Sequence, residues 1–201
     1  MANRILVWDV PTRVFHWLLA GSFAGAFITA DSEKWRDVHV ALGYIILALI
    51  AFRVVWGFAG TRYARFSSFA FGPAKVVAYL KSLWKGSPEH YVGHNPAGSW
   101  VIYGLLSLGL LSGATGYMAY SETGGEWREE LHELAANGML ALVGVHIAGV
   151  LVSSLLHREN LIRSMISGYK NGAAVQGIRR RHWIIGTGLL AGVIALWSGI
   201  I

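Results

Sequence analysis

Long apolar stretches alternate with short polar segments along this chain. Five of the stretches hold about 20 residues or more, the length that a helix needs to cross a bilayer core. They cover residues 11–30, 38–60, 99–120, 131–156 and 182–201. The pattern predicts an all-α integral membrane protein with five transmembrane helices. The first stretch lacks a small-residue cleavage site and holds His16, so we expect it to be retained as a span.

The longest polar connection, residues 61–98, contains a shorter helical segment of a different kind. The sequence PAKVVAYLKSLWKG, residues 73–86, places proline to start a helix and glycine to end it. Apolar side chains that face lipid and lysines that face phosphates predict a helix lying in the membrane interface, with partner docking as the alternative role. The apolar set is Val76, Val77, Leu80, Leu83 and Trp84, and the lysines are Lys75, Lys81 and Lys85.

Composition supports the membrane assignment and narrows the chemistry. Hydrophobic residues make up 54% of the 201 residues and charged residues only 14%, which is wrong for a soluble domain of this size. The loops are short and show no repeat, so we expect a single domain over residues 1–201. Cysteine is absent, which excludes disulfides, iron–sulfur clusters and thiolate metal sites. Any metal must therefore be held by nitrogen or oxygen.

The basic residues divide unevenly between the two sides of the predicted membrane. With the N-terminus in the cytoplasm, thirteen lysines and arginines flank the spans on that side, and only Lys34, Arg36 and Arg128 lie outside. The positive-inside rule favours this orientation. The outer side holds eight acidic residues against these three bases, so its net charge is −5. This negative charge favours a basic partner. Because the basic groups are spread over three membrane-flanking segments, nucleic-acid binding is not expected.

Four of the eight histidines lie in the first, second and fourth apolar stretches, where an imidazole is costly and usually functional. His132 and His146 are 14 residues apart, which puts them on one helix face, about 21 Å apart. In the predicted topology, His39 and His132 are level near the outer surface and form the outer pair. His16 and His146 are level nearer the cytoplasm and form the inner pair. Each pair can supply both axial nitrogens of one b-type haem.

Two further side chains are expected near the inner pair. Arg53 follows His39 by 14 residues, at a depth where a haem propionate would satisfy its charge. The alternative is an arginine that snorkels toward the headgroups. His94 is either a solvated or capping residue, or a contact for a quinone head group or a proton relay. Small residues that either admit a flat macrocycle or serve as ordinary helix contacts are Gly21, Gly25, Gly43, Gly144 and Gly149.

Histidines inside spans also serve as packing groups, proton relays or transition-metal ligands in transporters. A transporter is expected to show inverted repeats and broken helices, and the lengths of these stretches give no such sign. Two histidine pairs at two depths, with an arginine at the inner level, therefore favour haem over these alternatives.

Several short motifs follow one another along the chain: RVFHW at 13–17, HVALG at 39–43, FRVVWGFAGTRYARF at 52–66, HNPAG at 94–98, HELAAN at 132–137, GVHIAGV at 144–150 and HRENLIRSMISGYK at 157–170. In this order they resemble the bacterial cytochrome b561 family, in the branch that includes the b-type cytochrome subunits of nickel–iron hydrogenases. The resemblance covers residues 4–170. It implies a four-helix bundle in a bacterial inner membrane with two b haems, ligated by His16 with His146 and by His39 with His132. The fifth span, residues 182–201, lies beyond the matched region.

The resemblance also implies electron transfer between a membrane quinone or quinol and an outer redox protein, such as a cytochrome c or a dehydrogenase or hydrogenase subunit. A stand-alone superoxide:quinone oxidoreductase is the alternative, so enzymatic activity of the chain alone stays open. An anionic substrate calls for positive charge, which outside is confined to a local patch of Lys34, Arg36 and Arg128. We predict a quinone site near the inner pair, at Arg53 and His94.

Overall fold

The computed structural model describes residues 3–87 and 89–200, and most of them are helical. The long helices coincide with the five predicted stretches, and α3 coincides with the predicted interfacial segment, so the all-α fold is confirmed. The helices are α1 (Val10–Thr29), α2 (Arg36–Ala59), α3 (Pro73–Trp84), α4 (Pro96–Tyr120), α5 (Trp127–Leu156), α6 (Leu161–Ser167) and α7 (Trp183–Ile200). Short 3-10 turns occur at Glu33–Trp35, Phe66–Ser68 and Ala174–Gln176.

Within this described part of the chain, three helices are long and apolar enough to cross a membrane: Glu33–Ala59, Pro96–Tyr120 and Trp127–Leu156. The apolar part of α7, Trp183–Gly199, is shorter. Helix α1 has 20 residues but carries the polar side chains of Arg13 and His16. Packing on α2 and α7 therefore holds α1 in the bundle together with its own hydropathy.

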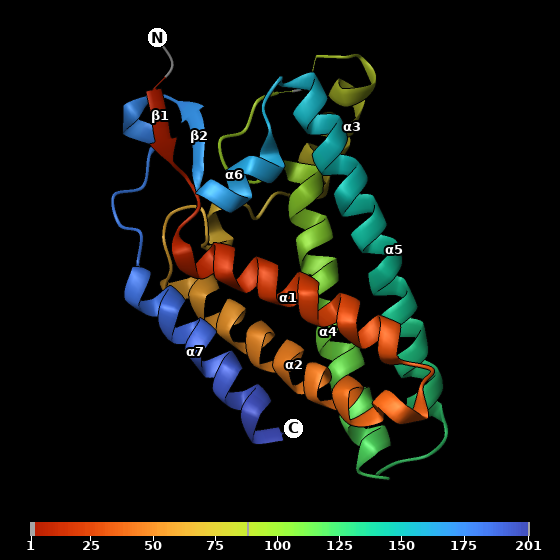
Figure 1. The fold of residues 1–201 in the computed structure, drawn as a ribbon. Coiled ribbons are helices and arrows are strands. Elements are labelled where there is room, and N and C mark those ends of the chain that lie inside the picture. The colour runs from red at the N-terminus through yellow and green to blue at the C-terminus, as the bar shows by residue number, and fades with distance from the viewer. Residues whose placement is uncertain (1–2, 88, 201) are drawn as a thin grey trace.

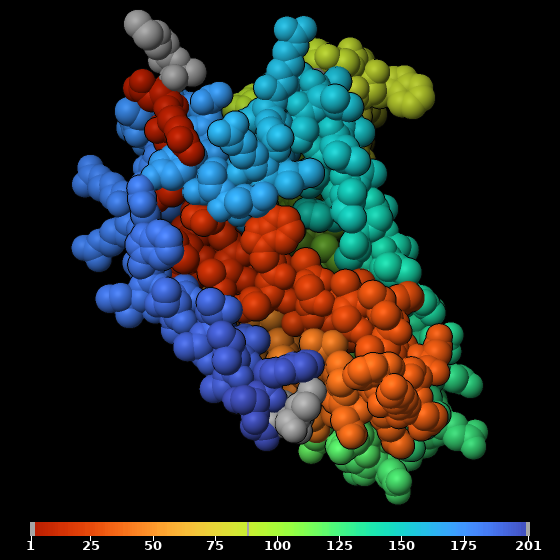
Figure 2. Space-filling model, in the orientation of Figure 1, coloured from red at the N-terminus to blue at the C-terminus, as the bar shows by residue number. Residues whose placement is uncertain are grey.

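The helices pack as two layers (Figure 1). Helices α1 and α2 pack on each other and α7 covers both, while α4 and α5 form a second tight pair that meets the first through α2 and α4. The core between α1 and α2 includes Phe15, Ile45 and Leu49. Helix α5 makes only sparse direct contact with α1 and α2. Figure 2 shows α1 lying across one face of the molecule, between α7 and α5.

A small antiparallel sheet joins the beginning of the chain to a distant segment. Strand β1 (Asn3–Leu6) pairs with β2 (Tyr169–Gly172), in a register that sets Leu6 opposite Tyr169. Gly168 lies just before β2 with φ +88°, and its carbonyl accepts hydrogen bonds from the N–H groups of Val7 and Trp8. A Cβ at Gly168 would lie 2.7 Å from the Trp8 carbonyl oxygen, so the close approach requires glycine. The apolar pattern did not predict this sheet.

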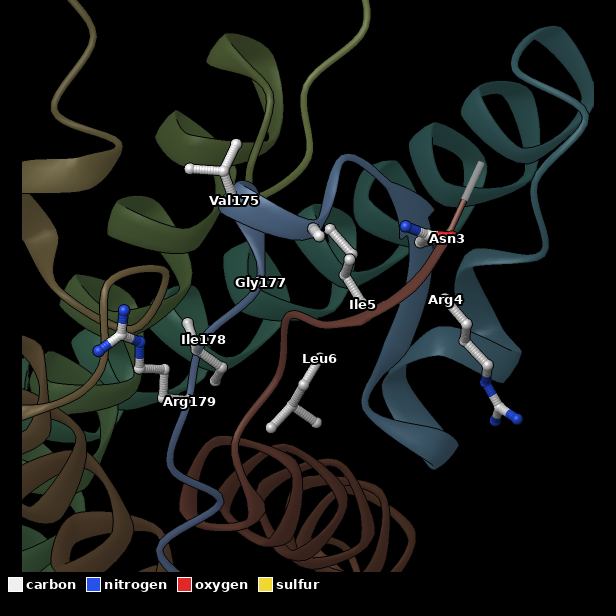
Figure 3. Close-up of a pocket in the computed structure, with 9 residues that line it drawn as sticks. Asn3, Arg4, Ile5, Leu6, Val175, Gly177, Ile178 and Arg179 are labelled. Carbon is white, nitrogen blue, oxygen red and sulfur yellow. The ribbon is translucent and has the colours of Figure 1, made fainter. Parts of the chain in front are cut away.

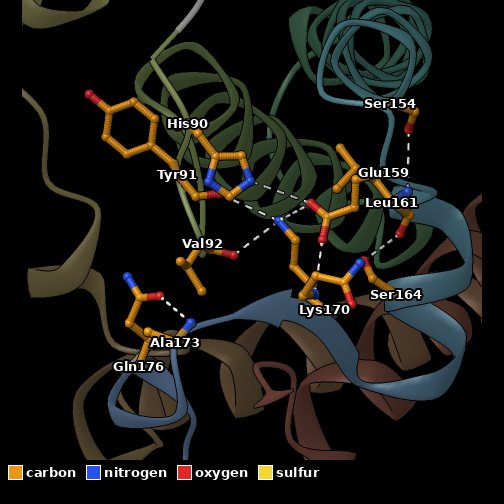
Figure 4. A network of polar contacts seen from close by, with 11 residues as sticks. His90, Tyr91, Val92, Ser154, Glu159, Leu161, Ser164, Lys170, Ala173 and Gln176 are labelled. Carbon is orange, nitrogen blue, oxygen red and sulfur yellow. Dashed lines mark hydrogen bonds and ion pairs between the residues drawn. The ribbon is translucent and has the colours of Figure 1, made fainter. Parts of the chain in front are cut away.

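A buried ion pair fastens the loops at the same end of the bundle (Figure 4). Lys170 Nζ lies 2.9 Å from Glu159 Oε2, and the two side chains are 3% and 13% exposed. Lys170 also donates hydrogen bonds to the carbonyls of Tyr91 and Val92, and His90 Nε2 lies 3.7 Å from Glu159 Oε2. The pair therefore ties together the loop before α4, the connection after α5, and β2.

Side-chain caps start two of the spans. Asp9 Oδ1 accepts a hydrogen bond from the Thr12 N–H at 2.8 Å ahead of α1. Asn95 Oδ1 accepts one from the Gly98 N–H at 2.7 Å ahead of α4, as the sequence predicts for an asparagine that precedes Pro96. Each cap satisfies an N–H that the first helical turn cannot.

Candidate functional site

The four histidines of the long helices come together as the two predicted pairs. His16 of α1 faces His146 of α5, with ring centres 6.3 Å apart. His39 of α2 faces His132 of α5, with ring centres 6.0 Å apart. Both pairs thus reach across the space between α5 and the α1–α2 layer, where direct contact between the helices is sparse.

This spacing fits two imidazoles on opposite sides of one metal ion. A histidine nitrogen binds a first-row metal at about 2 Å and lies about 1 Å from its own ring centre, so two such rings have centres about 6 Å apart. Among the described residues, no group of three or more histidine, cysteine or carboxylate side chains is placed to hold a metal. The donor set therefore fits an ion whose other ligands come from a planar group such as haem.

The backbone fixes the ring orientation of the outer pair. His39 Nδ1 lies 2.8 Å from the carbonyl oxygen of Ala26, and His132 Nδ1 lies 2.8 Å from that of Ser112. A carbonyl oxygen only accepts, so each Nδ1 carries the proton and each Nε2 keeps its lone pair free. This is the arrangement by which proteins orient imidazole ligands. Gly116 makes room for the His132 ring, since a Cβ there would lie 2.9 Å from Nδ1.

The inner pair has a different environment, rich in buried polar atoms without a hydrogen-bond partner. His16 Nδ1 is one of them, and Arg53 Nη1 and His94 Nδ1 are others. Arg53 is only 3% exposed, so the alternative of an arginine that snorkels to the headgroups is wrong. Unpaired buried donors are costly unless a bound group satisfies them.

Arg53 and His94 meet in one aromatic cluster. The Arg53 guanidinium lies 4.8 Å from the ring centre of Phe66 and 5.8 Å from that of Phe69. The His94 ring packs 4.4 Å from Phe69 and 4.8 Å from Trp8. Burial, with a smaller contribution from the nearby Arg53 charge, lowers the pKa of His94 to about 3. His94 is thus neutral near pH 7 and packed among aromatic rings, which differs from a solvated loop histidine.

Asp9 is a buried residue at this end that the sequence reasoning missed. It is 1% exposed, and its Oδ2 accepts hydrogen bonds from Trp56 Nε1 at 3.1 Å and from Thr61 Oγ1 at 2.6 Å. It therefore links the start of α1 to the end of α2. Its negative charge also interacts with the Arg53 guanidinium. An aspartate just before Val10 and Pro11 is a helix-start signal and would have revealed the cap.

Most of the glycines singled out in the sequence have no close neighbour from another part of the chain. An added Cβ would meet no atom within 4 Å at four of the five glycines singled out in the sequence, whereas at Gly25 it would lie 2.8 Å from Leu42. The four open positions are Gly21, Gly43, Gly144 and Gly149. They lie on α1, α2 and α5, the helices that carry the histidine pairs.

Two surface pockets lie away from the histidine rings. One of about 350 Å³ lies between β1 and the segment 174–179 (Figure 3), and Figure 3 shows its two arginines, Arg4 and Arg179, pointing in opposite directions. The other, of about 530 Å³, lies at the far end of the bundle and includes Arg36 and Arg128 among several glutamates. No histidine lines either pocket.

A family model and individual known proteins indicate the same group of proteins for this chain. Residues 7–168 match the family model described as prokaryotic cytochrome b561. The chain is 25% identical to the probable Ni/Fe-hydrogenase B-type cytochrome subunit of Azotobacter vinelandii, across 84% of this chain and 89% of that protein. It is 28% identical to the protein of the same description in Rhizobium leguminosarum bv. viciae, across 83% and 88%. No solved structure matches the chain.

Proposed function

The chain belongs to the prokaryotic cytochrome b561 family, and from this premise we propose that it is a two-haem cytochrome linking a membrane quinone to an outer redox protein. Membership makes it a b-type cytochrome, a haem-binding helical membrane protein of electron transport. The observation that carries the two-haem proposal is the pair of facing imidazole sets, with ring centres 6.3 Å and 6.0 Å apart.

His16 with His146 would hold the inner haem, and His39 with His132 the outer one. Bound haem iron supplies a centre that takes up and releases one electron. Two imidazoles per iron leave no open coordination position, which suits electron transfer rather than oxygen chemistry. Because His132 and His146 are 14 residues apart on α5, the pairs lie about 21 Å apart along the helix. They therefore lie at two depths of a hydrocarbon core about 30 Å thick.

Arg53 gives the inner site a buried positive charge. Its Nη1 has no hydrogen-bond partner and its guanidinium is buried beside Phe66 and Phe69. We assign it the role of neutralising a haem propionate, because a forked guanidinium suits a carboxylate.

The quinone site belongs at the same end, with Arg53 and His94 as its polar residues. A quinone head group needs apolar aromatic surface and a few polar contacts, and the Trp8, Phe69 and His94 cluster supplies aromatic rings beside a polar ring nitrogen. Neutral His94 can accept or donate one hydrogen bond at a carbonyl or hydroxyl oxygen. Its proton exchange would be with the side that carries the N-terminus, which we place in the cytoplasm of a bacterial inner membrane on the basic residue count.

The opposite end of the bundle is the proposed partner face. All eight of its acidic residues are exposed, which favours a redox protein with a basic patch. The curated relatives are described as cytochrome subunits of a Ni/Fe-hydrogenase, so a hydrogenase is the first partner to test. The acidic residues are Asp31, Glu33, Asp37, Glu122, Glu126, Glu129, Glu130 and Glu133.

The alternative of superoxide oxidation receives little support from this face. Arg128 donates to the carbonyls of Gly124 and Gly125 and lies 3.6 Å from Glu129. One of the three outer bases is therefore engaged in holding its own loop. The pocket that includes Arg36 and Arg128 is also lined by three glutamates, which disfavours an anion there.

The decisive experiment is a pyridine haemochrome assay on the purified chain. We expect about two b haems per polypeptide. One haem would mean that one histidine pair is not a ligand set, and no haem in a well-folded preparation would refute the proposal.

The quinone and partner assignments need separate tests. We expect His94→Gln and Arg53→Gln to lower quinol-driven haem reduction by about tenfold or more, while Tyr44→Phe, at the other end of α2, changes it little. Unchanged turnover in both variants would refute the quinone placement.

Retention of a hydrogenase or c-type cytochrome that is lost at raised salt would support the acidic partner face. Fast superoxide-dependent quinone reduction by the chain alone would favour the alternative.

A further inference from the structure

Helix α3 exposes an apolar stripe that nothing in the described chain covers. Trp84 is 94% exposed, and Val77 and Leu80 are each 50% exposed. At 100° per residue these three positions fall within about 60° of one another around the helix. The bundle side of α3 is formed instead by Val76 and Tyr79, which are buried. The sequence-based expectation that Val76 faces lipid is therefore wrong, and the α3 stripe comprises Val77, Leu80 and Trp84.

A hydrogen bond fixes the level of α3 along the bundle. The Trp100 indole, in the first turn of α4, donates to the Phe71 carbonyl at 2.9 Å, two residues before α3 begins. Helix α3 also packs directly on α4. The α3 stripe therefore lies level with the start of α4, at the boundary between the apolar surface of the long helices and the polar loops. Tryptophan at such a level is typical of the membrane interface.

The charge around the α3 stripe points to an anionic surface. Lys81 and Lys85 are exposed and follow the stripe around the helix, on the side away from the bundle. Residues 61–87 contain five basic side chains and no aspartate or glutamate. In a bilayer, the apolar stripe would contact the acyl chains and the bordering lysines would contact the headgroup phosphates.

We propose that α3 lies in the lipid interface at the N-terminal end of the bundle and binds anionic phospholipid headgroups. The α3 stripe inserts among the acyl chains, and Lys81 and Lys85 contact the phosphates. The anchored segment also carries Phe66 and Phe69 before α3 and His94 after it. Lipid contact thus holds in place the loop that covers the inner histidine pair, a role independent of haem stoichiometry and of the quinone assignment.

The absence of cysteine allows a direct test of the orientation of α3. Val77→Cys and Ala78→Cys each introduce one thiol for a bimane label, at exposed neighbours that point about 100° apart. The full chain is reconstituted in nanodiscs that contain lipids brominated along the acyl chain. We expect quenching at position 77 to exceed that at position 78 by about threefold or more. Equal quenching, or protection of position 77 from both lipid and aqueous quenchers, would overturn the proposal, the latter because protein then covers the stripe.

The lipid preference is tested with charge variants. We expect the double variant Lys81→Gln and Lys85→Gln to lower the association of spin-labelled phosphatidylglycerol, relative to phosphatidylcholine, by about tenfold. Arg179→Gln with Arg180→Gln removes the same charge from another exposed segment at the same end and should change the ratio by less than about twofold. Equal effects of the two double variants would show nonspecific attraction and would overturn the assignment of phosphate contacts to α3.

Discussion

The inner and outer pairs share a residue type and both use α5, yet the chain holds them differently. In the outer pair, both Nδ1 atoms bond to backbone carbonyls of neighbouring helices. In the inner pair, His16 Nδ1 has no partner, and the buried Arg53 and His94 nearby also have unpaired atoms. The outer pair is thus oriented by the fold itself, whereas we propose that a bound group completes the inner pair. Pre-oriented ligands suit plain electron transfer, and unpaired donors suit a site that also handles a substrate.

The largest expected effect comes from removing one ligand of either pair on α5. We expect His146→Ala and His132→Ala each to bind about one haem instead of about two, with the haem spectrum of the remaining pair unchanged. The pyridine haemochrome assay and redox titration distinguish the two variants. Retention of both haems in either variant, in a folded preparation, would contradict the ligand assignment for that pair.

The buried ion pair at the inner end should give the next largest effect. Lys170→Met leaves Glu159 buried without its partner, at an expected cost of about 3–5 kcal/mol in the free energy of unfolding. Because Lys170 also holds the loop that leads to His94, we expect the inner haem to be released first on heating in detergent. Stepwise loss of haem absorbance measures both effects.

The matched control lies at the outer end. Glu129 pairs with Arg128 at 3.6 Å, but its side chain is 69% exposed, so Glu129→Gln should cost less than about 1 kcal/mol. Similar losses in the two variants would show that burial does not decide the strength of these pairs.

Arg53 tests the buried charge of the inner site. Arg53→Gln would remove the proposed charge-assisted hydrogen bond to a haem propionate, about 1.5–3 kcal/mol, which corresponds to about tenfold or more in inner haem retention. Arg53→Lys keeps the charge and should lose less. Transfer of haem to apomyoglobin measures retention. If the outer haem were lost at the faster rate in Arg53→Gln, the assignment of Arg53 to the inner site would fail.

A smaller and local effect is expected at the outer pair. Gly116→Ala puts a Cβ within 2.9 Å of His132, so the ring or α4 must shift at a cost of about 1–3 kcal/mol. We expect the redox midpoint of the outer haem to change while that of the inner haem does not. Gly192→Ala on α7, where a Cβ meets no atom within 4 Å, is the neutral control.

The sequence predicted those features that depend on depth along a helix. Apolar length predicted the five long helices. The 14-residue spacing of His132 and His146 predicted His39 and His16 opposite them, because helix rise converts residue number into depth. Features that depend on which helix face meets a neighbour were not predicted. Val76 turned toward the bundle, and Arg53 is held among aromatic rings instead of snorkelling, because packing partners decide these positions.

The β1–β2 sheet was missed for a related reason. Four residues per strand give too short a pattern to recognise, and the partner of Leu6 is Tyr169, far beyond any window used to read periodicity. Asp9 was missed because its partners, Trp56 and Thr61, come from the end of α2. The local pattern of apolar and polar residues does not predict contacts between segments that are far apart in the sequence.

The β1–β2 pairing also has a consequence for biogenesis. Long-range strand pairs form late because the intervening chain must be ordered first, and here the ribosome must synthesise all of β2 before β1 has a partner. The N-terminal segment with Val7 and Trp8 therefore waits uncovered while the first four long helices enter the bilayer. Helix α7, which packs on α1 and α2, is synthesised later still. A chain that is interrupted before Gly168 leaves the N–H groups of Val7 and Trp8 without the carbonyl to which they bond.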